Sequence, residues 1–203
     1  MFTTRQLDNA LKKTSEYLKL AGKAIVLTVL IFAAGCGSSG TKTFSIKEGV
    51  QGFSFEYPSS YSLIRIDLSN TSDSAYTTIG LGARIGDAIS EIYVYVWPAS
   101  ADLLTATATV ETLLTNAQGV LTDFALDKKT ATTVDGQIAA GASFTAIDSG
   151  SGSGSPTGPA YYRITCFMYK SLIIELDMTS DVSLKEVTQG DYDHLLQTFA
   201  VLN

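Results

Sequence analysis

The sequence predicts an α+β domain in which a mainly antiparallel β-sheet is covered by helices on both faces, with a signal-peptide helix before it. Three observations lead to this fold class. Several segments alternate apolar and polar residues with a period of two, as half-buried strands do. Other segments are apolar on both faces, as strands in the middle of a covered sheet are. Two segments space their apolar residues by three and four, which is typical of amphipathic helices.

The chain divides into three regions. Its 203 residues, of which 45% are hydrophobic and 17% charged, suffice for one packed core. Residues 1–35 are interpreted as a signal peptide, residues 36–43 as a flexible tether, and residues 44–203 as the globular domain. Residues 1–22 are long for the start of a signal peptide. They are either an amphipathic extension or the product of a start upstream of the true one.

The segment that ends at Cys36 has the layout of a signal peptide. Lys23 precedes an apolar run of 11 residues, Ala24–Ala34, and Gly35 and Cys36 follow. A helix that spans a membrane needs about 20 apolar residues, and this run is little more than half as long. A cleaved signal is therefore favoured over the alternative, in which Cys36 is an ordinary small residue of a membrane helix.

The string AAGC at residues 33–36 resembles the lipobox of bacterial lipoproteins. The resemblance implies that a diacylglycerol is attached to Cys36 and that the precursor is cut between Gly35 and Cys36. Ala33 departs from the leucine that is usual at the first lipobox position. The protein is therefore expected at the cell membrane, anchored through Cys36 to membrane lipid, with its domain facing outside the cytoplasm.

Charge is unevenly placed along the chain. Residues 1–35 hold five Lys or Arg and two acids, whereas the remaining residues hold 9 basic and 18 acidic side chains. An acidic body without a basic run repels phosphate backbones, which argues against nucleic-acid binding. The seven residues 37–43 are rich in Gly and Ser and have a reach of roughly 15 Å, so the domain is expected to stay close to the membrane.

Strands are expected in most of the globular domain. Alternation with a period of two indicates the first three, and Pro58 ends the earliest of them. Segments that are apolar on both faces indicate central strands at Ile92–Trp97, Tyr161–Tyr169 and 172–174. In chain order the expected strands cover residues 53–57, 64–68, 79–85, 92–97, 122–134, 137–148, 160–169 and 172–178.

Two helices are expected to cover this sheet. The apolar residues of the first are Val110, Leu113, Leu114, Ala117 and Leu121, and those of the second are Tyr192, Leu195, Leu196 and Phe199. Asp191 and Asp193 are expected near the start of the second helix, where its dipole favours carboxylates. Residues Ser149–Pro159, which alternate Gly and Ser before two prolines, are expected to form a mobile hairpin tip or, alternatively, a binding loop.

The start and the end of the domain resemble one protein family. Phe44–Ile46, then Gly52–Pro58 with Tyr61–Leu63 after it, are similar to the opening of PsbP/Mog-type domains, and strands 160–169 and 172–178 with the Tyr192–Phe199 helix are similar to their ending. The resemblance covers residues 44–203. It implies a non-enzymatic α/β/α sandwich used for assembly or binding, and it assigns no functional residue.

Catalytic and metal-binding residues are not expected. The sole histidine, His194, lies on the last predicted helix and is interpreted as a surface or core-edge residue. Cys166 lies in an apolar segment and is interpreted as a buried thiol rather than a nucleophile. One histidine and one free cysteine are too few for a closed zinc site. The sequence therefore predicts a protein that is not an enzyme and carries no metal or cofactor.

Two strings and the aromatic residues leave alternatives open. Gly80–Gly86 is interpreted as a twisted strand and turn rather than a dinucleotide loop, and Asp67–Asp73 as a solvated turn rather than a calcium loop. Most aromatic residues are expected in the core. The alternative is that some of them line a groove for a peptide, a glycan or a lipid tail. The strand aromatics are Tyr93, Tyr95, Trp97, Tyr161 and Tyr162.

These observations predict a membrane-tethered, non-catalytic binding or assembly lipoprotein of the bacterial cell envelope, with an envelope protein as its partner. An envelope hydrolase is one alternative, and a deep cavity that encloses two close carboxylates would favour it. A carrier of small apolar ligands is the other, and a dry apolar tunnel between sheet and helix would favour that reading.

Overall fold

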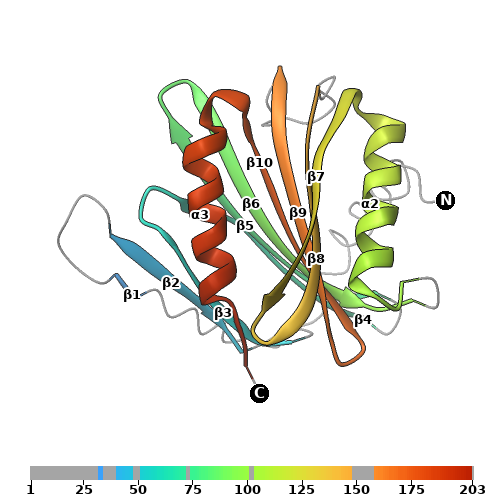
Figure 1. The fold of residues 1–203 in the computed structure, drawn as a ribbon. Helices are drawn as coiled ribbons and strands as arrows, with labels where there is room; N and C mark the ends of the chain where they lie inside the picture. The colour runs from blue at the N-terminus through green and yellow to red at the C-terminus, as the bar shows by residue number, and fades with distance from the viewer. Residues whose placement is uncertain are drawn as a thin grey trace.

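A seven-stranded antiparallel sheet organises the domain (Figure 1). The computed structural model describes residues 32–33, 40–47, 51–71, 74–100, 103–147 and 158–202. Across the large sheet the strands are β4 (Ser62–Thr71), β5 (Ser74–Ile85), β6 (Ala88–Pro98), β10 (Leu172–Asp181), β9 (Pro159–Tyr169), β8 (Gln137–Ile147) and β7 (Thr122–Val134). The segments that the sequence predicts to be central, in β6, β10 and β9, are the three middle strands.

A small sheet lies against one face of the large one. Its order is β1 (Phe32–Ala33), β2 (Thr41–Ile46), β3 (Phe53–Pro58) and β11 (Ala200–Val201). Strand β11 follows the last helix and pairs with β3, with Val201 opposite Phe53. The Leu202 amide donates to the Gly52 carbonyl at 2.9 Å, and the Val201 amide donates to Asp135 Oδ2 at 2.9 Å. The small sheet therefore joins early and late parts of the sequence.

Two described helices pack on the large sheet. Helix α2 (Ala106–Val120) begins after Thr105, whose hydroxyl oxygen accepts a hydrogen bond from the Ala108 amide at 3.1 Å. Helix α3 (Lys185–Thr198) follows a single 3₁₀ turn, η1 (Val182–Leu184), which Asp181 caps by accepting the Ser183 amide at 2.8 Å.

The main core lies between the large sheet on one side and α3 with the small sheet on the other. Phe199 is its centre, because its ring stacks on Phe53 at 5.5 Å and on Phe55 at 6.1 Å and meets the edge of Phe167 at 5.6 Å. These rings come from the small sheet, the end of α3 and β9. All four are at most 3% exposed, so they tie the layers of the domain together.

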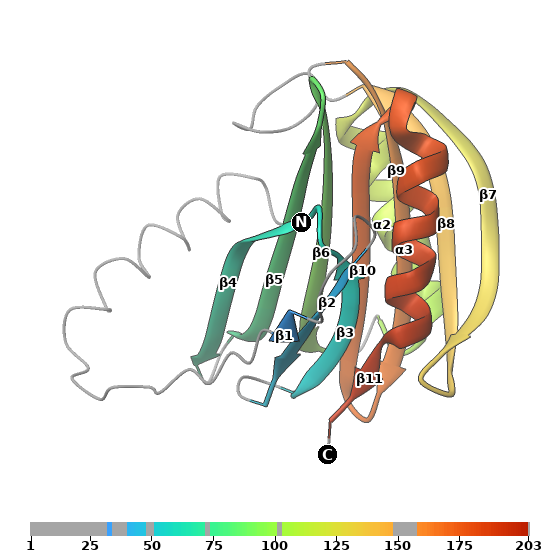
Figure 2. The same cartoon turned by 90° about the vertical axis from the view of Figure 1, so that its left-hand side faces the viewer.

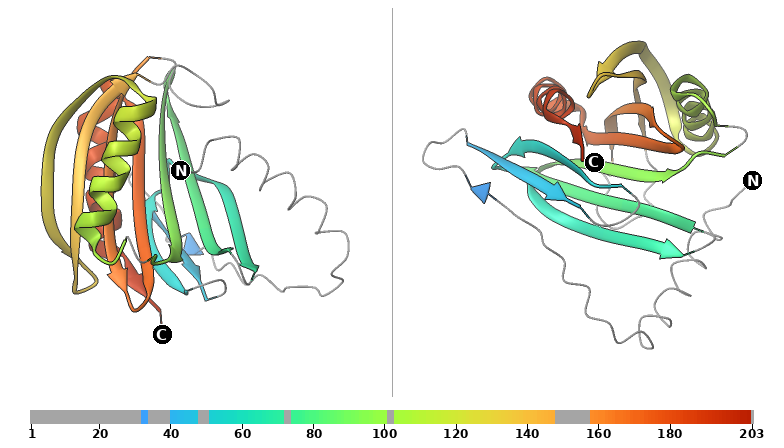
Figure 3. Two further views of the ribbon diagram at one scale, coloured as in Figure 1. Left: turned by 90° about the vertical axis from the view of Figure 1, so that its right-hand side faces the viewer. Right: turned by 90° about the horizontal axis from the view of Figure 1, so that it is seen from below.

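A second core lies under α2. Side chains of β9 alternate in direction, so Tyr161 and Phe167 belong to the main core, while Ile164 and Cys166 pack with α2. Helices α3 and α2 consequently lie on opposite sides of strands β8 and β9 (Figures 2 and 3). Helix α2 packs against β7, β8 and β9. On the same face of the sheet, strands β4, β5 and β6 lie to the side of this helix. Helical cover on this face is therefore partial.

The structure confirms the predicted mainly antiparallel sheet with two helices and adjusts several boundaries. Helix α3 begins at Lys185, so Asp191 and Asp193 lie in its middle and not near its start. Gly190 made the early turns hard to predict, because glycine disfavours helix interiors. Tertiary contacts outweigh that cost: buried Thr188 lies 3.1 Å from the Ser180 hydroxyl. The expected turn at Asp67–Asp73 is mostly strand, since β4 runs to Thr71, which pairs with Ser74 of β5, and residues 72 and 73 lie outside the described residues.

The predicted signal peptide lies almost wholly outside the described residues. Phe32 and Ala33 are described and form strand β1 beside Thr43 and Lys42 instead of the end of a helix. In the described parts of the chain, no helix is both long and apolar enough to cross a membrane. Residues 148–157, most of the expected hairpin tip, also lie outside the described residues, and Pro159 begins β9.

Candidate functional site

A polar groove runs between α3 and strands β7 to β9. It contains a pocket of about 290 Å³. The lining residues are Thr130, Ala131, Thr132, Thr133, Arg163, Thr165, Asp193, Leu196 and Gln197. Gly141 of β8 packs closely beside the lining residue Thr130, because a Cβ atom at Gly141 would come within 2.8 Å of the Thr130 hydroxyl. Apart from Ala131 and Leu196, the pocket is lined by residues with hydroxyl, amide or charged groups, whereas a carrier of apolar ligands needs a mainly apolar lining.

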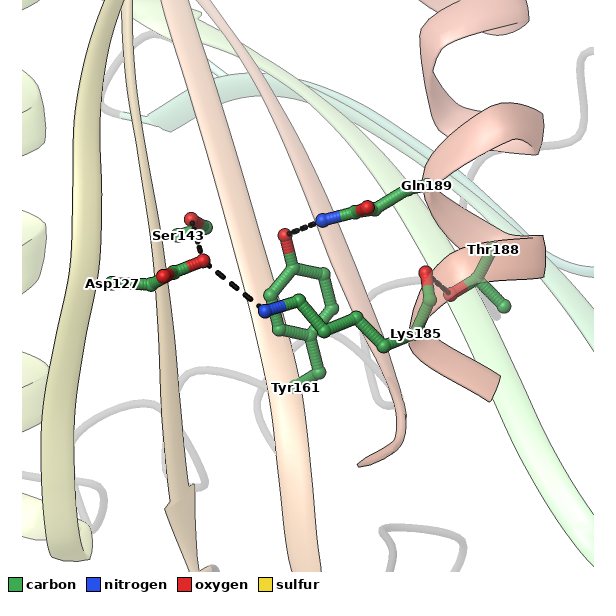
Figure 4. A network of polar contacts seen from close by, with 6 residues as sticks. All are labelled: Asp127, Ser143, Tyr161, Lys185, Thr188 and Gln189. Atoms are coloured by element: carbon green, nitrogen blue, oxygen red, sulfur yellow. Dashed lines mark hydrogen bonds and ion pairs between the residues drawn. The ribbon is translucent and has the colours of Figure 1, made fainter. Parts of the chain in front are cut away.

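The polar side chains along this groove hydrogen-bond to one another (Figure 4). Lys185 Nζ lies 3.2 Å from Asp127 Oδ2, which also accepts the Ser143 hydroxyl at 3.2 Å. These bonds lower the pKa of Asp127. Gln189 donates to the Tyr161 hydroxyl at 2.6 Å. One turn further along α3, Arg163 pairs with Asp193 at 2.6 Å. The network fastens α3 to the sheet, and its groups are occupied in doing so.

A different polar surface lies on the opposite face, beyond α2. We call it the aromatic face and define it as Glu91, Tyr93, Tyr95 and Trp97 of β6 with Glu175 and Asp177 of β10. Glu175 stands opposite Tyr95 on one side and Cys166 on the other. Because paired residues share a face, and Cys166 packs under α2, the aromatic face adjoins α2.

Two carboxyl groups form the centre of the aromatic face. Glu175 is 7% exposed, and its carboxyl group is hydrogen-bonded to that of Asp177 two residues later. Trp97 Nε1 donates to Glu175 Oε2 at 3.1 Å. Asp177 Oδ1 is buried and accepts no hydrogen bond. Burial raises the pKa of both groups, and the nearby Glu175 charge raises the pKa of Asp177 further, so the pair holds a proton that exposed carboxyl groups would lose.

Aromatic rings border this pair. The rings of Tyr93 and Tyr95 stack at 5.8 Å with an interplanar angle of 15°. Tyr93 lies over Gly80 of β5, where a Cβ atom would come within 2.7 Å of the ring, which explains why a glycine stands in this strand. The Tyr93 hydroxyl donates to Glu91 Oε2 at 3.3 Å. Burial raises the pKa of Tyr95, and the carboxyl pair raises it further, so Tyr95 remains a neutral phenol.

The two surfaces differ in one respect that decides between them. In the groove, the groups drawn in Figure 4 donate to and accept from one another. On the aromatic face, a buried acceptor oxygen of Asp177 has no donor. A buried polar atom without a partner is costly to a fold and requires an explanation. We therefore take the aromatic face as the candidate functional site.

The strand aromatic residues that the sequence analysis named do not all lie together in the structure. Tyr93, Tyr95 and Trp97 share the aromatic face. Tyr161 instead lies in the main core, and Tyr162 stacks on Phe144 at 4.9 Å beneath α2. The lipidation residues Gly35 and Cys36 lie outside the described residues.

The two residues considered for catalysis lie apart from each other. Cys166 is fully buried, as predicted, and burial raises the pKa of its thiol. His194 stands at the edge of the core with Nε2 3.2 Å from Glu56 Oε2 on β3, on the opposite side of the sheet. No nucleophile is therefore paired with the histidine among the described residues. The described residues also contain no group of three side chains that could hold a metal ion.

Sequence reasoning missed Glu175 and Asp177. The strand reads Leu172-Ile-Ile-Glu-Leu-Asp-Met178, and its start was interpreted as apolar on both faces. Two acids at alternate positions of a central strand were the available signal, because such acids share one covered face. A carboxylate is rarely buried without a reason, so this spacing was informative.

The carboxyl pair predicts a pH-dependent stability. Its folded-state pKa values are raised, so the stability that it contributes is present below the unfolded pKa of about 4 and is lost as the pH rises through the folded values. Asp177→Asn is expected to raise the free energy of unfolding at pH 8, because it removes the cost of a buried negative charge, and to change it much less at pH 4.5. Urea unfolding at both pH values measures this.

The matched control is Asp87→Asn, in the exposed turn after β5. It should change stability equally at both pH values. The ionisable groups that interact with the pair are Tyr95 on β6, Cys166 on β9 and Tyr192 on α3, and Glu91, Tyr93 and Arg65 lie nearby on the same face. Of these only Glu91 ordinarily titrates in this range. An Asp177→Asn variant that is less stable than the wild type at pH 8 would contradict the assignment.

Comparison with known proteins finds likeness in structure alone. No family model and no curated protein sequence matches this chain. The solution structure of cyanobacterial PsbP from Synechocystis sp. PCC 6803 superposes with a TM-score of 0.53 and 15% identity, covering 83% of this chain and 98% of that one. LpqN, involved in cell envelope biogenesis of Mycobacterium tuberculosis, superposes with a TM-score of 0.52 and 9% identity, covering 80% and 92%. A Pseudomonas aeruginosa protein of unknown function gives a TM-score of 0.50 at 15% identity, covering 68% and 94%.

These likenesses establish the fold. The predicted resemblance to PsbP-type domains is confirmed at the level of architecture, because the PsbP superposition includes nearly all of that protein. At 9–15% identity, the comparisons assign no ligand, partner or functional residue to this chain.

Proposed function

We propose that this chain is a non-catalytic binding module of the bacterial cell envelope, tethered through lipid on Cys36, and that its aromatic face holds a partner protein. The observation that carries the proposal is the row of partly exposed aromatic side chains Tyr93, Tyr95 and Trp97 beside the buried Glu175–Asp177 carboxyl pair, next to the strands that α2 covers. Interfaces are enriched in Tyr and Trp, which combine apolar area with a polar group. The envelope location is supported by the AAGC string and agrees with the envelope role of LpqN.

Direct contact between the two carboxyl groups argues against the hydrolase alternative. Glycosidases place their two carboxyl groups about 5–10 Å apart, so that a sugar and a water molecule fit between them. Glu175 and Asp177 are instead hydrogen-bonded to each other along one strand. Cys166 stands opposite Glu175, but its thiol is buried and its raised pKa keeps it protonated. These features favour binding over catalysis.

Site-specific crosslinking in the native envelope tests the proposal. An aromatic photo-crosslinking amino acid at position 93 preserves the shape of the tyrosine and places the reactive group on the aromatic face. Irradiation of intact cells is expected to join the lipoprotein to one protein, as a discrete adduct on a denaturing gel.

The control position is Val187, which is 58% exposed on α3, away from the aromatic face. An adduct at position 93 that is absent at position 187 supports the proposal. Equal adducts at both positions, or no adduct at position 93, would reject the aromatic face as the binding surface.

A further inference from the structure

We propose that the outer edge of strand β7 pairs with an extended, acidic segment of a partner protein, and that a polar side chain of this segment enters the pocket beside α3. We call residues Lys128–Thr133 of β7 the open edge. In the order of the large sheet, strands β8 and β9 separate it from β10 and the aromatic face. The inference therefore concerns a second surface and does not depend on the proposed function.

The open edge is regular and unprotected. Strand β7 is the last strand of the large sheet, and of the described strands only β8 pairs with it (Figure 2). Two register shifts interrupt this pairing before Lys128, whereas the pairing after Lys128 is regular and residues 130–133 include no charge and no proline. The opposite edge strand, β4, has a register shift just before Arg65 and bears the Arg65–Asp67 ion pair. Bulges, charges and proline ordinarily protect sheet edges, so the open edge is the one available for further pairing.

The hairpin turn between β7 and β8 determines which backbone groups of the open edge are free. Asp135 and Gly136 have φ angles of 48° and 74°, as in a two-residue type I′ turn. In such a hairpin the flanking residues, Val134 and Gln137, exchange both backbone hydrogen bonds, and bonded pairs alternate with non-bonded pairs along the strands. The residues whose N–H and C=O groups consequently point away from β8 are Lys129, Ala131 and Thr133. In the described chain these groups have no other hydrogen-bond partner, so they can bind an added strand.

The polar pocket lies directly beside the open edge. Thr130 and Thr132 line it, and they share a face of the sheet with Val134, which belongs to the main core under α3. Their hydroxyl groups and the Gln197 amide form no hydrogen bond among the described residues. A volume of about 290 Å³ corresponds to roughly ten water molecules of about 30 Å³ each, which is ample for one polar side chain.

An added strand would use this pocket. Residues directly opposite each other in paired strands share a face, so the residue opposite Thr130 or Thr132 would direct its side chain toward the pocket. In complexes formed by strand addition, main-chain hydrogen bonds supply affinity and pockets for alternate side chains supply specificity. The open edge and the pocket together provide both.

Charge determines which kind of segment fits. Four of the nine basic side chains after residue 35 lie along β7 and the groove, and they are Lys128, Lys129, Arg163 and Lys185. Each of the last three has an acidic partner at 3.2 Å or less. Lys128 is exposed and has no ion pair among the described residues. It lies two residues before Thr130 and shares its face, so a carboxylate opposite Lys128 would complete the pattern.

An acidic segment also fits this edge better than a second copy of the chain does. Residues 36–203 hold 9 basic and 18 acidic side chains, so two copies repel each other, and a second β7 would add two more lysines to the same edge. Lysines at a sheet edge deter unselective pairing. A carboxylate in the added strand removes that obstacle at Lys128.

A labelled peptide tests the inference. Fluorescein-Gly-Val-Thr-Val-Thr-Val-Glu-amide, paired antiparallel, places its glutamate opposite Lys128 and its threonines opposite Thr130 and Thr132. Fluorescence anisotropy measures its binding to the full-length protein in neutral detergent. We expect saturable binding that weakens about threefold when the glutamate is replaced by lysine, as for loss of one exposed ion pair.

N-methylation of the peptide distinguishes strand pairing from other contacts. The valine amides stand opposite the residues whose backbone groups are free, so N-methylation of the three valines should weaken binding by about tenfold or more. N-methylation of the two threonines blocks the other edge of the peptide and should preserve binding. This pair of peptides is matched in composition and needs no change to the protein.

Two variants of the protein test the same contacts from the other side. Ala131→Pro removes a free N–H and no bond to β8, and proline is tolerated where an edge N–H faces solvent. It should weaken binding about tenfold, with urea unfolding showing that the fold is kept. Lys128→Glu should weaken binding about threefold or more, whereas Lys47→Glu, at an exposed lysine after β2, should leave it unchanged.

Three results would overturn the inference. The first is the absence of saturable binding, and the second is equal binding of the two N-methylated peptides. The third is a dimer of the free protein in light scattering that Ala131→Pro dissociates, because it would assign the open edge to a second copy of the chain. An affinity unchanged by Lys128→Glu would reject the acidic character of the segment.

Discussion

Serine in place of Cys36 is expected to release the protein from the membrane. If Cys36 carries a diacylglycerol, the two acyl chains contribute about 0.8 kcal/mol for each buried methylene, which far exceeds any contact that the acidic domain makes with lipid. Cys36→Ser should abolish incorporation of radiolabelled palmitate and leave an uncleaved precursor. Fractionation of envelopes, followed by a high-salt wash, measures the attachment.

The matched control uses the other cysteine of the chain. Cys166→Ala changes a fully buried thiol that packs under α2, so it should retain the label and remain on the membrane after the salt wash. Palmitate label on the Cys36→Ser protein would reject Cys36 as the anchor. Loss of the label from the Cys166→Ala protein would indicate that the lipid is attached to Cys166 instead.

Alanine at Phe199 is expected to cost about 3–5 kcal/mol of stability, the range for large-to-small changes of buried aromatic residues. Phe199 is 3% exposed and contacts rings from both strands β3 and β9, so the cavity left behind would lie between layers that cannot easily close around it. Domains of this kind are stable by about 5–15 kcal/mol, so the loss is a large fraction of the total. Urea denaturation of the purified protein provides the measurement.

Two further variants test whether the loss of stability in Phe199→Ala comes from packing between the layers of the domain. Phe199→Leu keeps most of the volume and should cost about 1.5 kcal/mol or less, as shape-conserving changes in cores do. Val187→Ala removes an exposed apolar side chain from the same helix and should stay within about 0.5 kcal/mol. A Phe199→Ala protein as stable as Val187→Ala would show that the small sheet does not depend on this cluster.

Local patterns in the sequence predicted the strands well and the helix boundaries less well. The segments in β6, β9 and β10 that are apolar on both faces are the middle strands, because only covered strands bury both faces. The start of α3 was placed too late, since Gly190 interrupts the helical pattern and the contacts that compensate, such as Thr188 with Ser180, are tertiary. Such contacts leave no trace in the local spacing of residues.

Only the aromatic residues of the candidate site could be predicted from the sequence. Tyr93, Tyr95 and Trp97 stood out as aromatic residues on one strand, but Tyr161 and Tyr162 were grouped with them and lie elsewhere. The carboxyl pair depends on β10 lying beside β6, which are far apart in the sequence. The extent of the cover by α2 is also a tertiary property, because it depends on where a helix crosses a twisted sheet.

The pairing of β3 with β11 has a consequence for the order in which the chain folds. Phe53 is synthesised early and Val201 late, so the small sheet cannot be completed until nearly the whole chain has been synthesised. For the same reason, Phe199 cannot pack against Phe53 before that point. Contacts between distant residues close long loops and slow folding. A polypeptide that is exported as proposed here would thus remain without its final core while it is being threaded across the membrane, and the native structure would form only on the far side.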